Sequence, residues 1–447
     1  MKGSDDESSP SSDASESSDD QASEPPTTHK PTTLPPTTSE PTTQPPTSPA
    51  AWEEYGSNIN GENAFDFFGY LTALSGDGST IAGAASWSDV GGEYAGSVRV
   101  FRIKGNSWTQ IGHDIDGIAG ESEFAMTVAT SYDGSVVAIG GPTYGFTFKG
   151  RVRVFEYNRV TDWWSPLGDP IYGLNDFDVF GSSVSLSGNG RILAVGACLA
   201  DENGEDSGHV RVFGYGGGTE GWDQVGQTIG GENSFDLAGD RESVKLSHDG
   251  EILSVGSALK NSKGFHTGHV RMFRYDRNAN EWTQMGQDIQ EANTGDIGFG
   301  LSVDLSRDGT MIAIGAPGYD IGGQENCGLV QVYAYDNGDD NWYKVFGLIG
   351  LEGDECGISV SLSGDGKKVA FGCDQFDIGE KGELFIYQDN KELGKWVNTL
   401  YVAGEKNNDN FGVSVSLSDD GNVVAAGGHG NDGNGDLSGR ISVYKLE

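Results

Sequence analysis

The sequence predicts an all-β protein: a seven-bladed β-propeller of four-stranded antiparallel blades, preceded by a disordered tail. First, a Ser-x-Asp-Gly turn, once Ser-x-Asn-Gly, recurs seven times at intervals of 55–60 residues. Second, each interval holds four short segments, several with the two-residue alternation of β-strands. Such units cannot bury their faces alone, but seven arranged radially cover one another. The turns end at Gly78, Gly134, Gly190, Gly250, Gly309, Gly366 and Gly421.

The tail comprises residues 1–50, and the propeller residues 51–447. Residues 4–24 are mostly Ser, Asp and Glu, and residues 25–49 contain Pro-Thr clusters. With so few apolar residues, nothing offsets the entropy of ordering this segment, so we expect an extended chain with polyproline II character. The composition is also typical of O-glycosylated stalks, with an unmodified linker as the alternative.

The third unit shows the four strands of a blade. Phe180–Ser187 alternates apolar and small polar residues, and Arg191–Gly196 returns after the Gly-Asn-Gly turn. Gly208–Phe213 forms the third strand after a polar loop, and Trp222–Ile229 forms the fourth. The pattern predicts an inner-to-outer meander in every blade.

The seventh unit ends at Glu447 after three strands. Residues Trp52–Glu62 match Trp222–Glu232, with Trp, Gly and Ile in register. We therefore expect the N-terminal strand to complete the seventh blade and close the ring, which removes a free sheet edge.

The net charge is −39, of which residues 51–447 carry −32 because the tail has nine acidic and two basic side chains. An acidic domain repels nucleic-acid phosphates, so we expect no nucleic-acid partner. No segment approaches the ~20 apolar residues of a membrane span, and the first residues lack the apolar core of a secretory signal. Either the protein is cytosolic, or a signal is missing from this chain.

Phe-Gly pairs precede the turns at Phe68-Gly69, Phe180-Gly181, Phe299-Gly300 and Phe411-Gly412, and Gly315-Ala316-Pro317 follows one of them. The pair is altered to Phe124-Ala125, Asp240-Arg241 and Cys356-Gly357. The pattern resembles the FG-GAP repeats of the integrin α-subunit head and related propellers. This resemblance implies a protein-binding or adhesion module, although the family's Asp-x-Asp-x-Asp-Gly calcium loop is replaced here by the short Ser-x-Asp-Gly turn.

Two acidic loops are candidate calcium sites, because alternating Asp and Asn with Gly is how an EF-hand loop begins. The alternative is a solvated polar turn without metal. No other cofactor is expected. The candidate ligands are Asp432, Asn434 and Asp436 in one loop, and Asp201, Asn203 and Asp206 in the other.

Cys356 and Cys373 flank the turn Ser363–Gly366. If Gly364 and Asp365 form a two-residue turn, the two cysteines face each other at a non-hydrogen-bonded position, and a cross-strand disulfide is feasible. A longer turn would shift this register. The alternatives are two reduced thiols, or Cys327 as the rival partner.

The repeated arginines Arg99, Arg153, Arg211 and Arg271 and the fourth-strand tryptophans are interpreted as structural, each arginine serving its own blade. The histidines are scattered and no nucleophile motif is found. The sequence therefore predicts a protein that is not an enzyme, with a glycosidase or lyase built from propeller-face carboxylates as the alternative.

We expect a monomeric binding or adhesion module whose ligand, a protein or glycan, occupies the face carrying the longer loops, because variable loops on a rigid scaffold usually bind. These loops are residues 86–95, 143–149, 199–207, 258–267, 318–327, 374–381 and 429–438, with inter-blade connections such as 116–123, 172–179 and 231–239. The favoured location is extracellular or tethered to the cell surface. An intracellular protein-interaction scaffold is the alternative.

Overall fold

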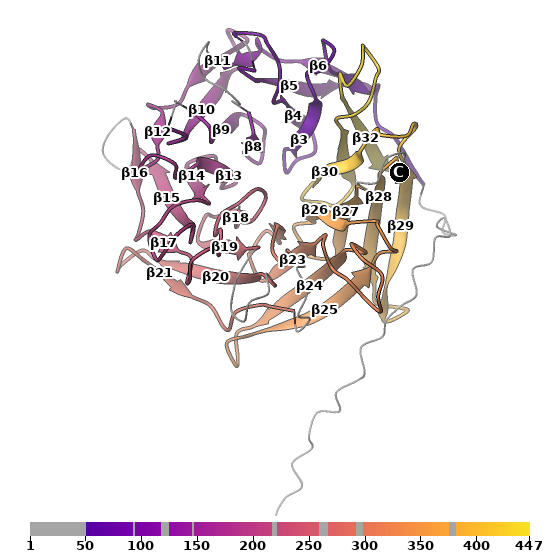
Figure 1. Ribbon diagram of the computed structural model, residues 1–447. Coiled ribbons are helices and arrows are strands. Elements are labelled where there is room, and N and C mark those ends of the chain that lie inside the picture. The colour runs from indigo at the N-terminus through magenta and orange to yellow at the C-terminus, as the bar shows by residue number, and fades with distance from the viewer. Residues whose placement is uncertain are drawn as a thin grey trace, which may run out of the picture. The chain divides into compact units, whose positions relative to one another are not determined.

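The computed structural model describes residues 51–447 except 93, 118–124, 145–146, 217–220, 259–266, 292–297 and 375–380. The described residues form 32 strands and no helix, so none of them forms a helix that could cross a membrane. Seven antiparallel sheets surround a central axis (Figure 1). The predicted seven-bladed propeller is confirmed, while the predicted tail and parts of the loops 143–149, 258–267, 374–381 and 116–123 lie outside the described residues.

Each blade runs from an inner strand at the axis to an outer strand at the rim. The inner strands are β3 (Phe68–Leu74), β8 (Thr127–Thr130), β13 (Phe180–Leu186), β18 (Val244–Leu246), β22 (Ser302–Leu305), β26 (Cys356–Leu362) and β30 (Phe411–Leu417). The second strands are β4 (Thr80–Ala85), β9 (Val136–Gly141), β14 (Ile192–Ala197), β19 (Ile252–Ser257), β23 (Met311–Ala316), β27 (Lys368–Cys373) and β31 (Val423–Gly428). The third strands are β5 (Ser97–Lys104), β10 (Arg151–Asn158), β15 (His209–Tyr215), β20 (His269–Asp276), β24 (Leu329–Asp336), β28 (Glu383–Asn390) and β32 (Arg440–Leu446).

The outer strands are continuous in blades 5 and 6 and interrupted elsewhere. They are β6 (Ser107–Gln110), β11 (Trp163–Pro166), β16 (Trp222–Gln224), β21 (Glu281–Gln284), β25 (Asn341–Ile349), β29 (Lys395–Ala403) and β1 (Trp52–Glu54). In blades 1, 2, 3 and 7 a second short piece pairs with the third strand: β7 (Ile115–Asp116), β12 (Ile171–Tyr172), β17 (Ile229–Gly230) and β2 (Ile59–Asn60).

The N-terminal strand completes blade 7, as predicted. Trp52 pairs with Leu446 and Glu54 with Tyr444, while Ile59 pairs with Ile441. Both ends of the folded chain therefore lie in one sheet.

The Ser-x-Asp-Gly turn is a self-contained hydrogen-bonded unit. In blade 1, Ser75 Oγ donates to Asp77 Oδ1 over 2.6 Å, and the same carboxylate accepts from the Ser79 N–H. Gly78 has a φ of +69°, a conformation that glycine adopts without a Cβ penalty. Local bonding of this kind explains why the motif recurs in every blade.

A closed ring of seven backbone hydrogen bonds joins the turns of successive blades. Tyr132 N–H donates to Gly188 O over 2.8 Å, and Asp419 N–H donates to Gly76 O over 2.9 Å, which closes the ring between blades 7 and 1. The remaining donor and acceptor pairs are Asp77 to Tyr132, Gly188 to His248, His248 to Arg307, Arg307 to Gly364 and Gly364 to Asp419.

Neighbouring blades are also joined near the rim. The tryptophans of five outer strands donate their indole N–H to a carbonyl of the preceding blade, as Trp164 does to Ile111 O over 3.0 Å. The four repeated arginines do the same, as Arg271 does to Gly230 O over 2.6 Å. The tryptophans are packing residues as expected, but the arginines bridge two blades and do not each serve only their own. The other pairs are Trp108–Tyr55, Trp222–Leu167, Trp282–Val225, Trp342–Met285, Arg99–Asn60, Arg153–Asp116 and Arg211–Tyr172.

Candidate functional site

The inner strands of all seven blades line a central cavity of about 120 Å³. Most of its lining side chains are small, apolar or hydroxyl-bearing. The charged lining residues are Arg241, Glu242 and Lys245, all from blade 4. The lining of this cavity is therefore uncharged except for the residues that blade 4 contributes to it.

Blade 4 differs from the repeat at this place. Ala238 forms a parallel β-bridge with Gly208, just as Phe180 of blade 3 forms one with Gly150. A Cβ on Gly196 would lie 2.0 Å from Gly239 O, as one on Gly427 would lie 1.9 Å from Gly69 O. Ala238-Gly239 is thus the counterpart of Phe-Gly, and the assignment of Asp240-Arg241 to that pair was wrong.

This register shows an insertion of two residues. From the glycine of the Phe-Gly position to the turn serine there are six steps in blade 1, Gly69 to Ser75, and eight in blade 4, Gly239 to Ser247. The extra length shortens the regular strand to Val244–Leu246. Because repeat proteins depart from their pattern chiefly where function or strain demands it, this insertion marks the channel as the candidate site.

Lys245 and Asp304 form an ion pair in the channel. Lys245 Nζ lies 3.2 Å from Asp304 Oδ1, and the lysine side chain is 44% exposed, which is exposure to the channel interior. The other oxygen of Asp304 accepts hydrogen bonds from Ser361 Oγ and Leu362 N–H of blade 6 over 2.8 and 2.7 Å. Burial disfavours the charged form of Lys245, but the Asp304 carboxylate outweighs this and raises the lysine pKa.

Glu242 is the titratable group best suited to proton transfer. Burial raises its pKa to about 7, although a hydrogen bond with Ser359 and the charge of Lys245 act in the opposite direction. A carboxyl group with a pKa near the working pH can both accept and donate a proton. Glu242 and Lys245 thus place an acid–base group and a cation in the lining of one cavity, with the Asp304 carboxylate paired to the lysine.

Side chains bridge the turn-face end of the channel. Arg307 of blade 5 hydrogen-bonds Asp419 of blade 7 and His248 of blade 4, and its guanidinium lies 4.8 Å from the Tyr132 ring centre of blade 2. Blades 2 and 5 lie across the ring from each other, so these contacts cross the axis (Figure 1). Any access to the channel from solution would therefore be from the loop face.

The six predicted calcium ligands lie in two exposed loops that occupy equivalent places in blades 3 and 7. Asp201 and Asp432 each accept a backbone N–H of their own loop, from Asp206 and Leu437. Asn203 and Asn434 donate their amides to Gly231 O and Gly61 O, which attaches each loop to the following inter-blade connection. Calcium binding here stays a prediction.

Within the part of the chain that is described, one group of His, Asp and Glu has ligand atoms within 4.8 Å of one another: Glu232, His269 and Asp288. It contains none of the six predicted ligands.

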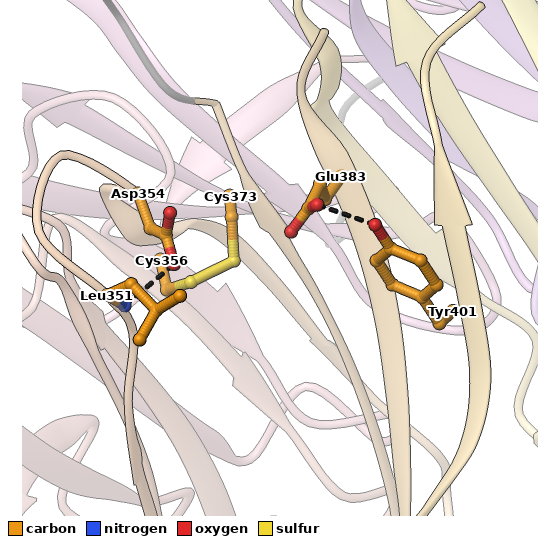
Figure 2. The surroundings of a disulfide bond; sticks show 6 residues. All are labelled: Leu351, Asp354, Cys356, Cys373, Glu383 and Tyr401. Carbon is orange, nitrogen blue, oxygen red and sulfur yellow. Dashed lines mark hydrogen bonds between the residues drawn. A yellow bond between two sulfur atoms is a disulfide. The ribbon is translucent and has the colours of Figure 1, made fainter. Parts of the chain in front are cut away.

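Cys356 of β26 and Cys373 of β27 are paired residues, and their sulfur atoms are joined in a disulfide (Figure 2). Cys327, the rival partner, is buried and free. The turn holds four residues, since Ser363 N–H bonds Lys368 O, so the expected two-residue turn was wrong. A β-bulge between Cys356 and Val360 shifts the register back and restores the pairing.

The comparisons with known proteins support the fold. Residues 174–213 match the FG-GAP repeat family, which confirms the predicted resemblance. No curated relative matches the sequence. A putative 6-phosphogluconolactonase from Bacteroides uniformis is similar in structure, with a TM-score of 0.52, 12% identity, and coverage of 76% of this chain and 86% of that one. The periplasmic gluconolactonase of Pseudomonas aeruginosa has a TM-score of 0.52, 17% identity, and coverage of 75% and 86%.

These comparisons contradict the prediction that the protein is not an enzyme, because chains that share its fold are named as lactonases. At such low identity the likeness shows the fold alone. Glu242, Lys245 and Asp304 were not among the residues predicted from the sequence. Their signal was the 60-residue interval from Gly190 to Gly250, the longest of the six.

Proposed function

We propose that the protein is a carbohydrate-active hydrolase whose reaction takes place at the loop-face end of the central channel. The observation that carries the proposal is the two-residue insertion of blade 4, which brings Glu242 and Lys245 to the axis beside Asp304. The names of the structurally similar lactonases favour a sugar lactone as the first substrate class to test.

Each residue has a distinct role in lactone hydrolysis. The Glu242 carboxylate takes a proton from water as the water oxygen bonds to the lactone carbonyl carbon. The Lys245 ammonium stabilises the negative charge that develops on the carbonyl oxygen. The ring C–O bond then breaks, and Glu242 returns the proton to the leaving oxygen, which yields the hydroxy acid. Asp304 positions the lysine.

The cavity size limits what enters. About 120 Å³ corresponds to roughly four water molecules at ~30 Å³ each. Only the reacting end of a sugar would therefore occupy the channel, and the rest of a larger carbohydrate would lie on the loop face.

The test is hydrolysis of a panel of sugar lactones and glycosides by the full chain. Glu242→Gln should lower kcat at least ~100-fold, the usual contribution of acid–base catalysis. Glu251→Gln is the matched control, because Glu251 belongs to the same blade but pairs with Arg277 at the surface. Turnover that survives in Glu242→Gln would exclude the channel as the active site.

The location belongs to the proposal as well. A disulfide is typical of oxidising compartments, and this supports an extracellular propeller held away from a surface by its Pro/Thr-rich tail.

A further inference from the structure

A second cavity, of about 780 Å³, opens on the loop face between blades 7 and 1. Its walls are residues 63–67 of the inter-blade connection, parts of the loop 87–94, and Leu437. The volume lies within the ~300–1,000 Å³ of small-molecule sites. None of these residues lines the central channel.

Aromatic side chains dominate its walls. Phe65, Trp87 and Tyr94 are 55%, 49% and 50% exposed. Trp87 contacts Phe67, with ring centres 4.9 Å apart, and Tyr94, at 6.0 Å and nearly perpendicular. Grouped exposed aromatic rings on a soluble domain mark a binding surface.

The pocket is preorganised by its backbone. Phe65, Phe67 and Tyr94 have φ values of +66°, +53° and +52°, which bulky residues rarely adopt. Hydrogen bonds hold them there: Phe65 N–H donates to Asp436 O, and Tyr94 N–H to Asp89 Oδ1. Phe177 and Phe235 repeat the Phe65 conformation at two other junctions. Among the described residues, this junction adds Trp87 and Tyr94.

The charged groups that line the pocket are acidic. Its charged lining residues are Asp66 and Asp89, with no lysine or arginine among the residues that line it. His429, which lies behind Phe67 at 5.7 Å, is buried, and burial lowers its pKa to about 4, so it adds no positive charge at neutral pH. Aromatic faces beside a carboxylate are suited to an organic cation, and the charge of −32 on residues 51–447 attracts cations.

We propose that this aromatic pocket binds an amino-sugar unit, with the sugar ring against Trp87 and Tyr94 and its ammonium group directed to Asp89. The choice of a carbohydrate rests on the proposed function. The pocket would hold part of a carbohydrate chain whose reacting end lies in the channel, so it extends the substrate class to glycans that carry protonated amino groups.

Calorimetry with a glucosamine tetramer tests the proposal, with the fully N-acetylated tetramer as the uncharged comparison. Both are titrated into the full chain carrying Glu242→Gln, so binding is measured without turnover. We expect the glucosamine tetramer to bind, Trp87→Ala and Asp89→Asn each to weaken it about tenfold, and the acetylated tetramer to bind more weakly. Trp163→Ala is the matched control, because Trp163 is equally exposed, at 52%, in β11 of blade 2.

Equal affinity for both tetramers would overturn the role of the ammonium group. An absence of binding would overturn the site. Thermal melts of each variant show whether a lost affinity comes from unfolding. Tetramer binding by a Glu242→Gln chain that has lost turnover would support the aromatic pocket as a site separate from the channel, whereas turnover that survives in Glu242→Gln would contradict the proposed function and leave the binding result standing.

Discussion

Asp304→Ala should destabilise the propeller at its axis. The carboxylate of Asp304 accepts from Ser361 Oγ and Leu362 N–H and pairs with Lys245. Its removal leaves the Leu362 N–H without this acceptor inside the sheet, at about 1–3 kcal/mol, and leaves Lys245 without its partner. Because Lys245 is partly exposed to the channel, the ion pair adds little, and we expect a total of about 3 kcal/mol.

Urea unfolding of the full chain measures this free energy. Lys245→Met removes the ion pair but keeps the hydrogen bonds that Asp304 accepts from Ser361 Oγ and Leu362 N–H, so it should lower the free energy of unfolding by less than about 1 kcal/mol. Asp304→Asn retains one acceptor and should fall between the two. A stability of Asp304→Ala within about 0.5 kcal/mol of the unmodified protein would refute the role of the link between blades 5 and 6, as would equal losses in Asp304→Ala and Lys245→Met.

Three further predictions concern the channel carboxyl, the disulfide and ring closure. The folded-state pKa of Glu242 is raised to about 7, so the folded protein binds more protons than the unfolded chain from about pH 4.5 to 7. Its free energy of unfolding should therefore fall by up to about 3 kcal/mol as the pH rises through that window. Glu242→Gln should remove this pH dependence in urea titrations at stepped pH. Replacing Cys356 and Cys373 by serine opens a loop with a sequence separation of 17 and should lower unfolding free energy by about 3 kcal/mol, whereas free thiols in non-reducing peptide maps of native protein would show that the bond is not used. Deleting residues 51–62 removes β1 and β2 and should sharply lower the melting temperature, and an unchanged melt would contradict closure through blade 7.

The sequence was sufficient for the fold because the defining interactions are local. The bonds of Asp77 to Ser75 and Ser79 span two residues, so the turn has the same residues wherever it occurs. The segment that begins at Trp52 was recognisable as the outer strand of blade 7 for a similar reason. It carries Trp, Gly and Ile at the same spacing as the segment that begins at Trp222.

The candidate site could not be found in this way because it depends on contacts between blades. Asp304 accepts a hydrogen bond from the N–H of Leu362, which lies 58 positions further along the chain, and no local sequence pattern predicts that contact. Blade 4 was misread since Ala238 replaces the phenylalanine that identifies the pair elsewhere. The cysteine pairing was inferred from a turn of the wrong length, and the bulge after Cys356 cancelled the error.

The ring of seven turn-to-turn hydrogen bonds has a consequence for where the chain can begin. Every link joins main-chain groups, and residues as different as Gly188, His248 and Asp419 occupy the linking position. The hydrogen bonds of the ring therefore do not depend on side-chain identity, and because the ring is closed it has no first or last blade. Blade 7 holds the termini, yet its link to blade 1 is of the same kind as the others. We therefore expect circular permutants to keep the same closed ring of turn-to-turn hydrogen bonds. In these permutants Glu447 is joined to Ala51, and the new ends lie in the outer strand of another blade.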